Sequence, residues 1–171
     1  MDQTLQRAVE AVQAMTGVDH YHTFRDHLTI TFDREHIQGV CRMLRDDHGF
    51  NVLVFETAVD YLGRKTPRFH VVYHLHNRVD DVRLFLRTPV PEEDPITDSV
   101  VDIFANANWY EREIWDLYGV RFAGHPNLRR LMLPKGWEGH PMRKDVPVKV
   151  EETRFTFNYE EIDLHKFYAE E

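Results

Sequence analysis

The chain has 171 residues, of which 42% are hydrophobic and 29% charged, the composition of a globular domain with a sizeable core. Its formal net charge of −8 argues against general nucleic-acid binding, and its one cysteine excludes an internal disulfide or an all-cysteine metal or iron–sulfur site. The sequence contains no apolar run long enough to span a membrane and no secretory-signal pattern at its start, so a cytoplasmic location is expected.

The first third of the chain predicts two helices and two short strands. Apolar residues at helical spacing indicate a helix over 3–15, which Gly17 ends. Two short strands are expected around 18–24 and 27–32. Asp33 is then a candidate N-cap for a second helix that ends at His48-Gly49.

The middle of the chain predicts an antiparallel sheet. Strand-like runs at 51–61, 68–76 and 81–87 follow each other at the spacing of a meander. The prolines that follow, Pro89, Pro91 and Pro95, indicate an extended linker outside the sheet. The predicted fold class is therefore α+β, a mainly antiparallel sheet with helices on one face, followed by a long irregular Pro/Gly-rich C-terminal extension.

A short amphipathic helix precedes that extension. Asn108 with Glu111 three residues later fits a capping box, and Gly119 fits the position after the last helical residue. Beyond it, Gly or Pro recurs so often that no ordinary helix or strand is expected. We therefore divide the chain into an α+β core at 1–118 and an extended partner-wrapping segment with an acidic tail at 119–171.

Charge changes sign along this extension. Between Arg121 and Asp145 six bases stand against two acids, whereas after Val150 seven acids stand against two bases. A basic band followed by an acidic tail suggests electrostatic docking on a partner. Large apolar residues in the basic band, such as Phe122 and Trp137, are the expected anchors of that contact.

Two charged positions of the amphipathic helix raise questions. Arg112 and Asp116 are four residues apart and are predicted to pair. Glu111 points between apolar neighbours, so it must be paired, hydrogen-bonded, protonated or able to reach solvent. The candidate partners are Arg129, Arg130, Arg143 and Lys144. A catalytic acid–base role is the remaining alternative, although no nucleophile arrangement accompanies it.

The same stretch carries a family resemblance. It contains Glu111-Arg112-Glu113, Asp116-Leu117-Tyr118, Gly124-His125-Pro126, Leu128-Arg129-Arg130-Leu131, Trp137, Gly139-His140-Pro141 and Arg143-Lys144-Asp145. These motifs, with Val59-Asp60-Tyr61 and Arg68-Phe69 upstream, resemble the complex I 30 kDa subunit family, whose members are the C subunits of NADH:quinone oxidoreductase. Ala105, Met142 and Val146 depart from the common pattern and affect local packing.

The resemblance implies a non-catalytic structural subunit in the peripheral arm of the complex, on the cytoplasmic side of the inner membrane. It would dock on the 49 kDa-type subunit and cluster-bearing neighbours, with membrane association through the complex only and no nucleic-acid partner. FMN, iron–sulfur clusters, NADH and quinone would be bound by other subunits, so no catalytic, cofactor or metal residues are expected here. The interface residues would be Glu111, Arg112, Glu113, Asp116, His125, Arg129, Arg130, Trp137, His140, Arg143, Lys144 and Asp145.

Two alternatives remain open. Related subunits occur in membrane-bound hydrogenases and in complexes fed by ferredoxin or a deazaflavin. An independent histidine–metal enzyme is the alternative from another class, because His70, His74 and His76 share one face of a predicted strand. Without a carboxylate or cysteine at close spacing, a solvated or interface-facing strand surface is favoured. His125 and His140, each followed by proline, are interpreted as hydrogen-bonded loop locks.

Overall fold

The computed structural model describes residues 3–19, 21–25, 27–146 and Leu164. Its elements, in chain order, are α1 (Gln3–Thr16), β1 (His22–Phe24), β2 (His27–Thr31), the 3-10 turn η1 (Arg34–His36), α2 (Ile37–Asp46), β3 (Val52–Asp60), β4 (Phe69–Asn77), β5 (Val82–Val90), β6 (Ile96–Asp98), α3 (Ala107–Tyr118) and β7 (Arg121–Ala123). The predicted α+β class is confirmed.

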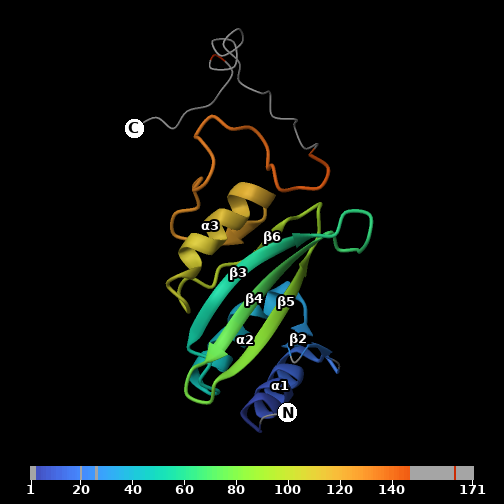
Figure 1. Ribbon diagram of the computed structural model, residues 1–171, viewed down its shortest axis with the longest axis vertical. Coiled ribbons are helices and arrows are strands. Elements are labelled where there is room, and N and C mark those ends of the chain that lie inside the picture. Colours follow the sequence, from blue (N-terminus) through green and yellow to red (C-terminus); the bar gives the residue numbers. More distant parts are fainter. Residues whose placement is uncertain (1–2, 20, 26, 147–163, 165–171) are drawn as a thin grey trace.

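The main sheet has five strands in the order β1-β2-β5-β4-β3 (Figure 1). The meander β3-β4-β5 is antiparallel, as predicted, and β1 pairs with β2 in a hairpin. The junction between these two units is parallel, because β2 lies beside β5 in the same direction. The sheet is thus mainly antiparallel, and β5 lies at its centre.

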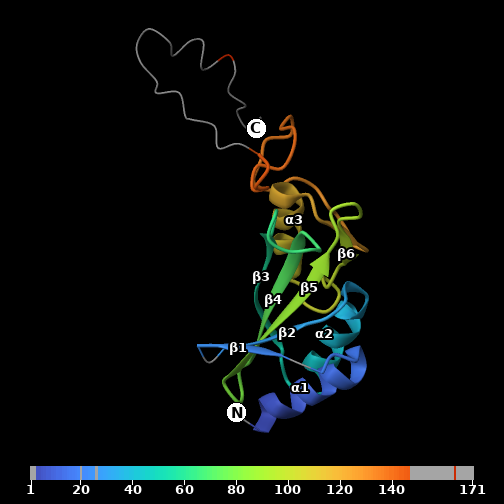
Figure 2. The ribbon, with the colours of Figure 1, turned by 90° about the vertical axis from the view of Figure 1, so that its right-hand side faces the viewer.

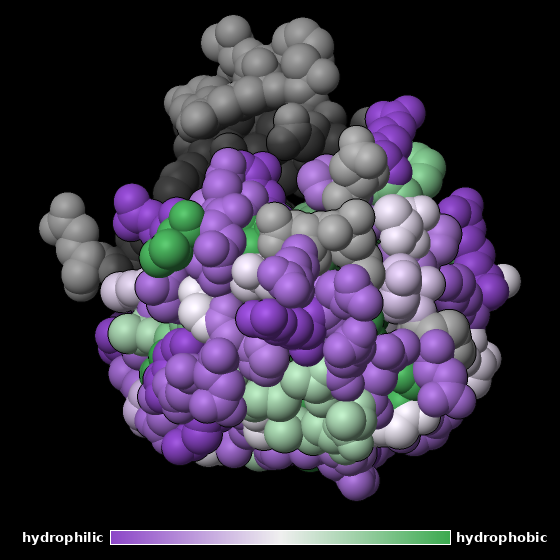
Figure 3. All heavy atoms as spheres, turned by 90° about the horizontal axis from the view of Figure 1, so that it is seen from below, coloured by the Kyte–Doolittle hydropathy of each residue, from purple (hydrophilic) through white to green (hydrophobic). Residues whose placement is uncertain are grey.

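One face of the sheet packs on helices. Figure 2 shows α1 and α2 together on one side of the strands. Inward strand residues such as Ile30, Tyr73 and Leu86 are fully buried, as are Val40 and Leu44 of α2. This alternation of buried side chains along the strands places the core between the sheet and the helices. The end of the molecule that carries α1 is mostly hydrophilic, with smaller apolar areas between the polar ones (Figure 3).

The proline linker begins later than predicted. Pro89 lies inside β5, opposite His70 of β4. The sheet tolerates it because β2 pairs with β5 only as far as Arg87, so beyond that residue β5 has a neighbour on one side alone. A proline can occupy such an edge because no ladder hydrogen bond is needed from its nitrogen.

Two short strands occur where the sequence indicated irregular chain. β6, in the expected linker, pairs in parallel with β7, just after α3. Neither strand has a pattern long enough to be recognised alone, because each is stabilised by pairing with a segment about 25 residues away. The second helix also differs at its start, since Asp33 precedes the turn η1, makes no side-chain capping hydrogen bond, and α2 begins at Ile37.

The outer edge of β3 is covered by α3. The Nδ2 of Asn106 donates to the carbonyl oxygen of Leu53 at 2.7 Å, and the hydroxyl of Tyr110 donates to that of Val54 at 3.0 Å. These bonds fall at the register shift between Leu53 and Phe55, where carbonyls leave the regular ladder. The helix therefore both closes an exposed strand edge and is fixed in place by it.

Candidate functional site

The helix α3 and the chain that follows it form the candidate functional site. The helix begins at Ala107 after Asn106, so the predicted start and capping box at Asn108 are wrong. It ends, as predicted, at Gly119, whose φ of +78° is left-handed. After β7, residues 124–146 run around α3 without further helix or strand, as the orange segment of Figure 1 shows.

Asp116 is the main anchor of this segment. Its buried carboxylate accepts hydrogen bonds at Oδ2 from the backbone N–H groups of three successive residues, Leu131, Met132 and Leu133, at 2.8–3.0 Å. Its Oδ1 accepts a 2.6 Å bond from Nη1 of Arg130. Burial acts to raise the pKa of Asp116, but these donors outweigh it and hold the pKa below its ordinary value. The carboxylate stays ionised and fixes the path of the chain.

Arg112 does not pair with Asp116, contrary to the sequence prediction. Its Nε and Nη2 donate to the carbonyl oxygens of Arg129 and Arg130 at 3.1 and 3.2 Å. The guanidinium also lies 5.2 Å from the centre of the Trp109 ring. Two residues one turn apart on α3 thus bind opposite polar groups of one segment, Arg112 the carbonyls and Asp116 the N–H groups.

The far part of the segment binds the C-terminal end of α3. Nδ1 of His140 donates to the carbonyl of Asp116 at 2.9 Å, and Nε of Arg143 donates to that of Tyr118 at 2.6 Å. The backbone N–H of Met142 donates to the carbonyl of Leu117 between them. Carbonyls in the last helical turn have no partner within the helix, and they carry its negative dipole end. A segment rich in basic side chains is therefore well suited to bind the carbonyl groups at this end of α3.

The two histidine–proline pairs lock this segment, as predicted. Nδ1 of His125 accepts the N–H of Asn127 at 3.0 Å, which leaves its Nε2 to donate to the carbonyl of Asn108 at 3.2 Å. His140 makes the bond to Asp116 described above. Each ring holds the chain against α3 through a backbone carbonyl of that helix.

Gly119 is required at the point where the segment crosses the helix end. A Cβ there would overlap Nη2 of Arg143 and the ring of His140, besides having to adopt a left-handed backbone. We expect Gly119→Ala to lower the free energy of unfolding by about 2 kcal/mol or more in urea denaturation.

Gly124→Ala is the matched control for Gly119→Ala. Gly124 has a similar φ of +81°, but a Cβ there meets no atom within 4 Å. Gly124→Ala should lower the free energy of unfolding through backbone strain alone. The decrease should therefore be smaller than in Gly119→Ala. Equal losses in both variants would show that the contact with Arg143 and His140 is unimportant.

A second anchor holds the end of the segment against the turn between β3 and β4. The buried guanidinium of Arg68 binds both carboxylate oxygens of Asp60 at 2.8 and 3.0 Å, and its Nη2 binds Oδ1 of Asp145 at 2.9 Å. Asp60 also accepts the backbone N–H of Lys144 at 2.9 Å. Burial alone would raise the pKa of Asp60, but Arg68 and the backbone donors lower it to about 2.

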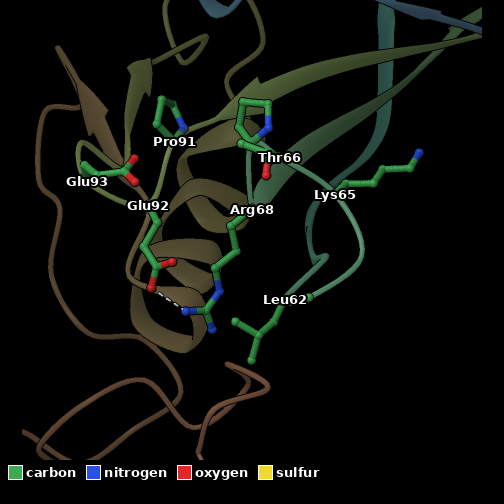
Figure 4. Close-up of a pocket in the computed structure, with 9 residues that line it drawn as sticks. Leu62, Lys65, Thr66, Arg68, Pro91, Glu92 and Glu93 are labelled. Carbon is green, nitrogen blue, oxygen red and sulfur yellow. Dashed lines mark hydrogen bonds and ion pairs between the residues drawn. The ribbon is translucent and has the colours of Figure 1, made fainter.

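Glu92 completes this anchor at the mouth of a small cavity. In Figure 4 its carboxylate points toward the guanidinium of Arg68, whereas Lys65 points away. The cavity has a volume of about 210 Å³. It is smaller than a typical ligand pocket, which indicates a structural ion network rather than a binding site.

Glu111 is enclosed and binds none of the predicted bases. Its side chain is fully buried, and Oε1 accepts the N–H of Val100 at 2.7 Å. Burial raises its pKa to about 7. The pairing with arginine or lysine and the solvent-exposed interpretation are therefore both wrong. A side chain with no exposed surface also gives the acid–base alternative no support.

The histidines of β4 lie on the face of the sheet opposite α2. His70 and His74 are 6% and 7% exposed, so they are not solvated as one interpretation held. His74 stacks on Phe85 with ring centres 4.2 Å apart, and His70 meets the edge of Tyr61. Burial lowers the pKa of both to about 4. Among the described residues, no three His, Cys, Asp or Glu side chains gather as a metal site.

The remaining predicted interface residues differ in accessibility. Glu113, Arg129, Lys144 and Asp145 are exposed, whereas Trp137 is half-buried and its carbonyl accepts Nη2 of Arg130. Phe122, expected to anchor a partner, is instead buried in the chain's own core. Asp60 and Arg68 lie in two of the motifs that resemble the family, but no sequence signal marked them as an ion pair.

The chain matches a known family over most of its length. The model of the family described as "Respiratory-chain NADH dehydrogenase, 30 Kd subunit" matches residues 30–152. A protein of Roseiflexus sp. (strain RS-1), named as the C subunit of NADH-quinone oxidoreductase, is 46% identical over 150 residues, which is 86% of each chain. The protein of that name in Geobacter sulfurreducens is 44% identical over 126 residues, or 74% of this chain and 78% of its own.

Solved structures agree with the fold. A trypsin-resistant fragment (1–134) of Nqo5 is 34% identical and superposes with a TM-score of 0.65, covering 74% of this chain and 100% of the fragment. A chain of an archaeal respiratory membrane complex, the membrane-bound sulfane sulfur reductase, gives a TM-score of 0.73 at 21% identity, over 99% of this chain and 97% of its own. The second likeness shows a shared fold.

Proposed function

The chain belongs to the 30 kDa subunit family of respiratory-chain NADH dehydrogenases, and from this premise we propose that it is a non-catalytic structural subunit of a proton-translocating NADH:quinone oxidoreductase. It belongs to the peripheral arm, where it docks on the 49 kDa-type subunit and supports electron transfer from NADH to quinone. The observation that carries the proposal is the family match, which spans all of α3 and the segment bound to it.

The geometry supports docking through α3 and its segment. Because Asp116, Arg112 and Arg68 fix the chain from inside, the side chains that point outward are held in place. Trp109, Met132 and Met142 are each more than half exposed there. Large apolar side chains exposed beside charged groups are typical of protein–protein interfaces. A rigid surface of this kind loses little entropy on binding.

The basic residues divide into two groups. Arg130 and Arg143, both expected at the interface, bind groups of their own chain through these side chains. Arg129 is exposed, and its side chain makes no ion pair among the described residues. In our proposal Arg129, with the exposed Glu113 of α3, forms the charged contacts with the neighbouring subunit.

We propose that this subunit holds none of the redox groups of the complex. FMN, the iron–sulfur clusters, NADH and quinone are bound by other subunits of the complex. Within the described residues, no helix is long and apolar enough to cross a bilayer. We therefore propose that the chain reaches the cytoplasmic face of the membrane through its partner subunits.

Affinity purification from gently solubilised membranes tests the proposal. The tagged chain is expected to recover a large assembly with cluster-bearing subunits and NADH-dependent quinone reduction. The charge reversal Arg129→Glu should reduce both the yield of that assembly and its turnover. Arg7→Glu, an exposed base on α1 far along the chain from α3, is the matched control and should change neither.

The contrary outcomes are distinct. An assembly with a hydrogenase subunit and no NADH activity would indicate a related complex instead. Recovery of the chain alone would contradict a role as a subunit. Unchanged assembly and turnover in Arg129→Glu would contradict the proposed contact at α3.

A further inference from the structure

The second face of the main sheet is covered by no element that the structure describes. In Figure 1 this face is turned toward the reader, with α2 behind the strands. In Figure 2 the hairpin of β1 and β2 extends from the same face, on the side away from the helices. The sheet and the hairpin together form two walls of a groove.

The groove has a volume of about 720 Å³ and an aromatic floor. Phe55 of β3, Val72 of β4 and Phe85 of β5 line the sheet side, and Phe24 lines the hairpin side. Phe24 is 61% exposed, although an aromatic ring is among the side chains that gain most from burial. An exposed phenylalanine above a floor of half-buried ones is the arrangement of an interface hot spot without its partner.

The charge of the groove is opposite to that of the chain. Its charged lining residues are Lys65 and Arg87, and no aspartate or glutamate lines it among the described residues, whereas the whole chain carries −8. Arg87 is half-buried where it lines the groove. A guanidinium beside an apolar surface pairs best with a carboxylate.

We propose that this groove receives an acidic segment of a neighbouring subunit, with a carboxylate on Arg87 and Lys65 and an apolar side chain between Phe24, Phe55 and Phe85. The inference rests on the proposed function, because the occupant is another subunit of the same complex. The groove would be a second contact surface, separate from the one proposed at α3 and its segment. A polypeptide fits better than a small molecule because the groove is open along the sheet face. The hairpin closes it on one side, and the other side is open.

A thiol placed in the groove reports its occupancy. Thr57 is exposed and lines the groove, and the chain's single cysteine, Cys41, is fully buried. In Thr57→Cys, a water-soluble maleimide should therefore label the new thiol in the free chain. In the purified complex we expect labelling to slow by at least about tenfold. Cross-linking from this thiol, read by mass spectrometry, should identify a partner peptide that contains Asp or Glu.

Substitutions then test the chemistry of the occupant. Lys65→Glu and Phe24→Asp each put an acid into the groove at positions outside the core, so the melting temperature of the free chain should not change. Each should lower recovery of the complex by about tenfold and restore labelling of the thiol. Arg7→Glu on α1, which packs on the other face of the sheet, should do neither.

Several results would overturn the inference. Equal labelling rates in the free chain and an active complex would reject the groove while the proposed function stands. Protection that Lys65→Glu does not reduce would reject an acidic occupant, and protection of the free chain by a quinone alone would reject a protein one. Failure of the chain to enter any complex would reject the proposed function and this inference with it.

Discussion

Replacing Asp116 by alanine is expected to release residues 129–133 from α3 and to lower the free energy of unfolding by about 3 kcal/mol. The substitution removes the acceptor of three backbone N–H groups and the partner of Arg130 at once. It also leaves Arg112 as the remaining α3 side chain that holds this part of the segment. Urea denaturation measures the loss, and trypsin, which cleaves after Arg129 and Arg130, measures the release.

Two further variants calibrate this result. Asp116→Asn keeps an acceptor oxygen but loses the charge. Its free energy of unfolding should therefore fall between those of wild type and Asp116→Ala. Glu113→Gln, at an exposed position on the same helix, should leave stability and trypsin cleavage unchanged. Slow cleavage after Arg129 in Asp116→Ala would mean that other contacts suffice to fix the segment.

The second large effect is the fall in the contribution of Glu111 to stability between about pH 5 and pH 7. Burial raises the pKa of Glu111 from its ordinary value of 4.5 to about 7. Over that range the folded chain holds a proton on Glu111 that the unfolded chain has released, so the contribution of Glu111 to stability falls as the pH rises and levels off above the folded pKa. At about 1.4 kcal/mol for each pKa unit, Glu111 alone accounts for about 3 kcal/mol.

Glu56 strengthens this pH dependence. It is fully buried on β3, and neither carboxylate oxygen has a hydrogen-bond partner within the described residues. Burial, together with the charge of Glu111, raises its pKa well above the ordinary value. Two interacting acids in one core cannot both ionise without a large cost.

Glu56→Met provides the test. Because it replaces an unpaired buried carboxyl by an apolar side chain of similar length, the variant should be more stable than wild type at pH 8, and its advantage over wild type should be smaller at pH 5. Urea denaturation at each pH gives both values, with Glu113→Gln as the control for loss of one acid. A difference in stability between variant and wild type that is the same at pH 5 and pH 8 would contradict the assignment of a proton to Glu56.

Two aspartates with lowered pKa values give the opposite trend, a loss of stability at acidic pH. Asp60, whose pKa is lowered to about 2, and Asp116, whose pKa is also lowered, release protons more readily when the chain is folded. Their contribution is present above the ordinary value of 3.8 and is lost as the pH falls toward 2. His70 and His74, whose pKa values burial lowers from 6.5 to about 4, act in the same direction, because below pH 6.5 the unfolded chain holds protons that the folded chain does not.

Much of the fold could be predicted because the signals were local. The helix over 3–15 is α1, and the three strand-like runs are β3, β4 and β5, since apolar periodicity reports which side of an element is buried. Gly119 ended α3 as expected, because few residues other than glycine adopt a left-handed backbone at low cost. The family resemblance rested on residues at fixed spacing, and the comparisons confirm it.

The errors share a physical cause. The predicted partners of Glu111 and Asp116 were chosen by helical spacing or by charge. The structure gives Glu111 the backbone N–H of Val100, and it gives Asp116 the backbone N–H groups of residues 131–133 besides the side chain of Arg130. Backbone N–H groups occur at almost every residue, so no sequence pattern marks the ones that a carboxylate will bind.

The sequence by itself determined the class of the fold, the meander, the end of α3 and the family, because each depends on residue types at short, regular spacing. The tertiary structure alone decided that the basic segment is bound to its own helix, that Glu56 and Glu111 share one core, and that no described element covers one face of the sheet. Those outcomes depend on which surfaces meet when distant segments pack together, and the free energy of that packing is not written in any single stretch of the chain.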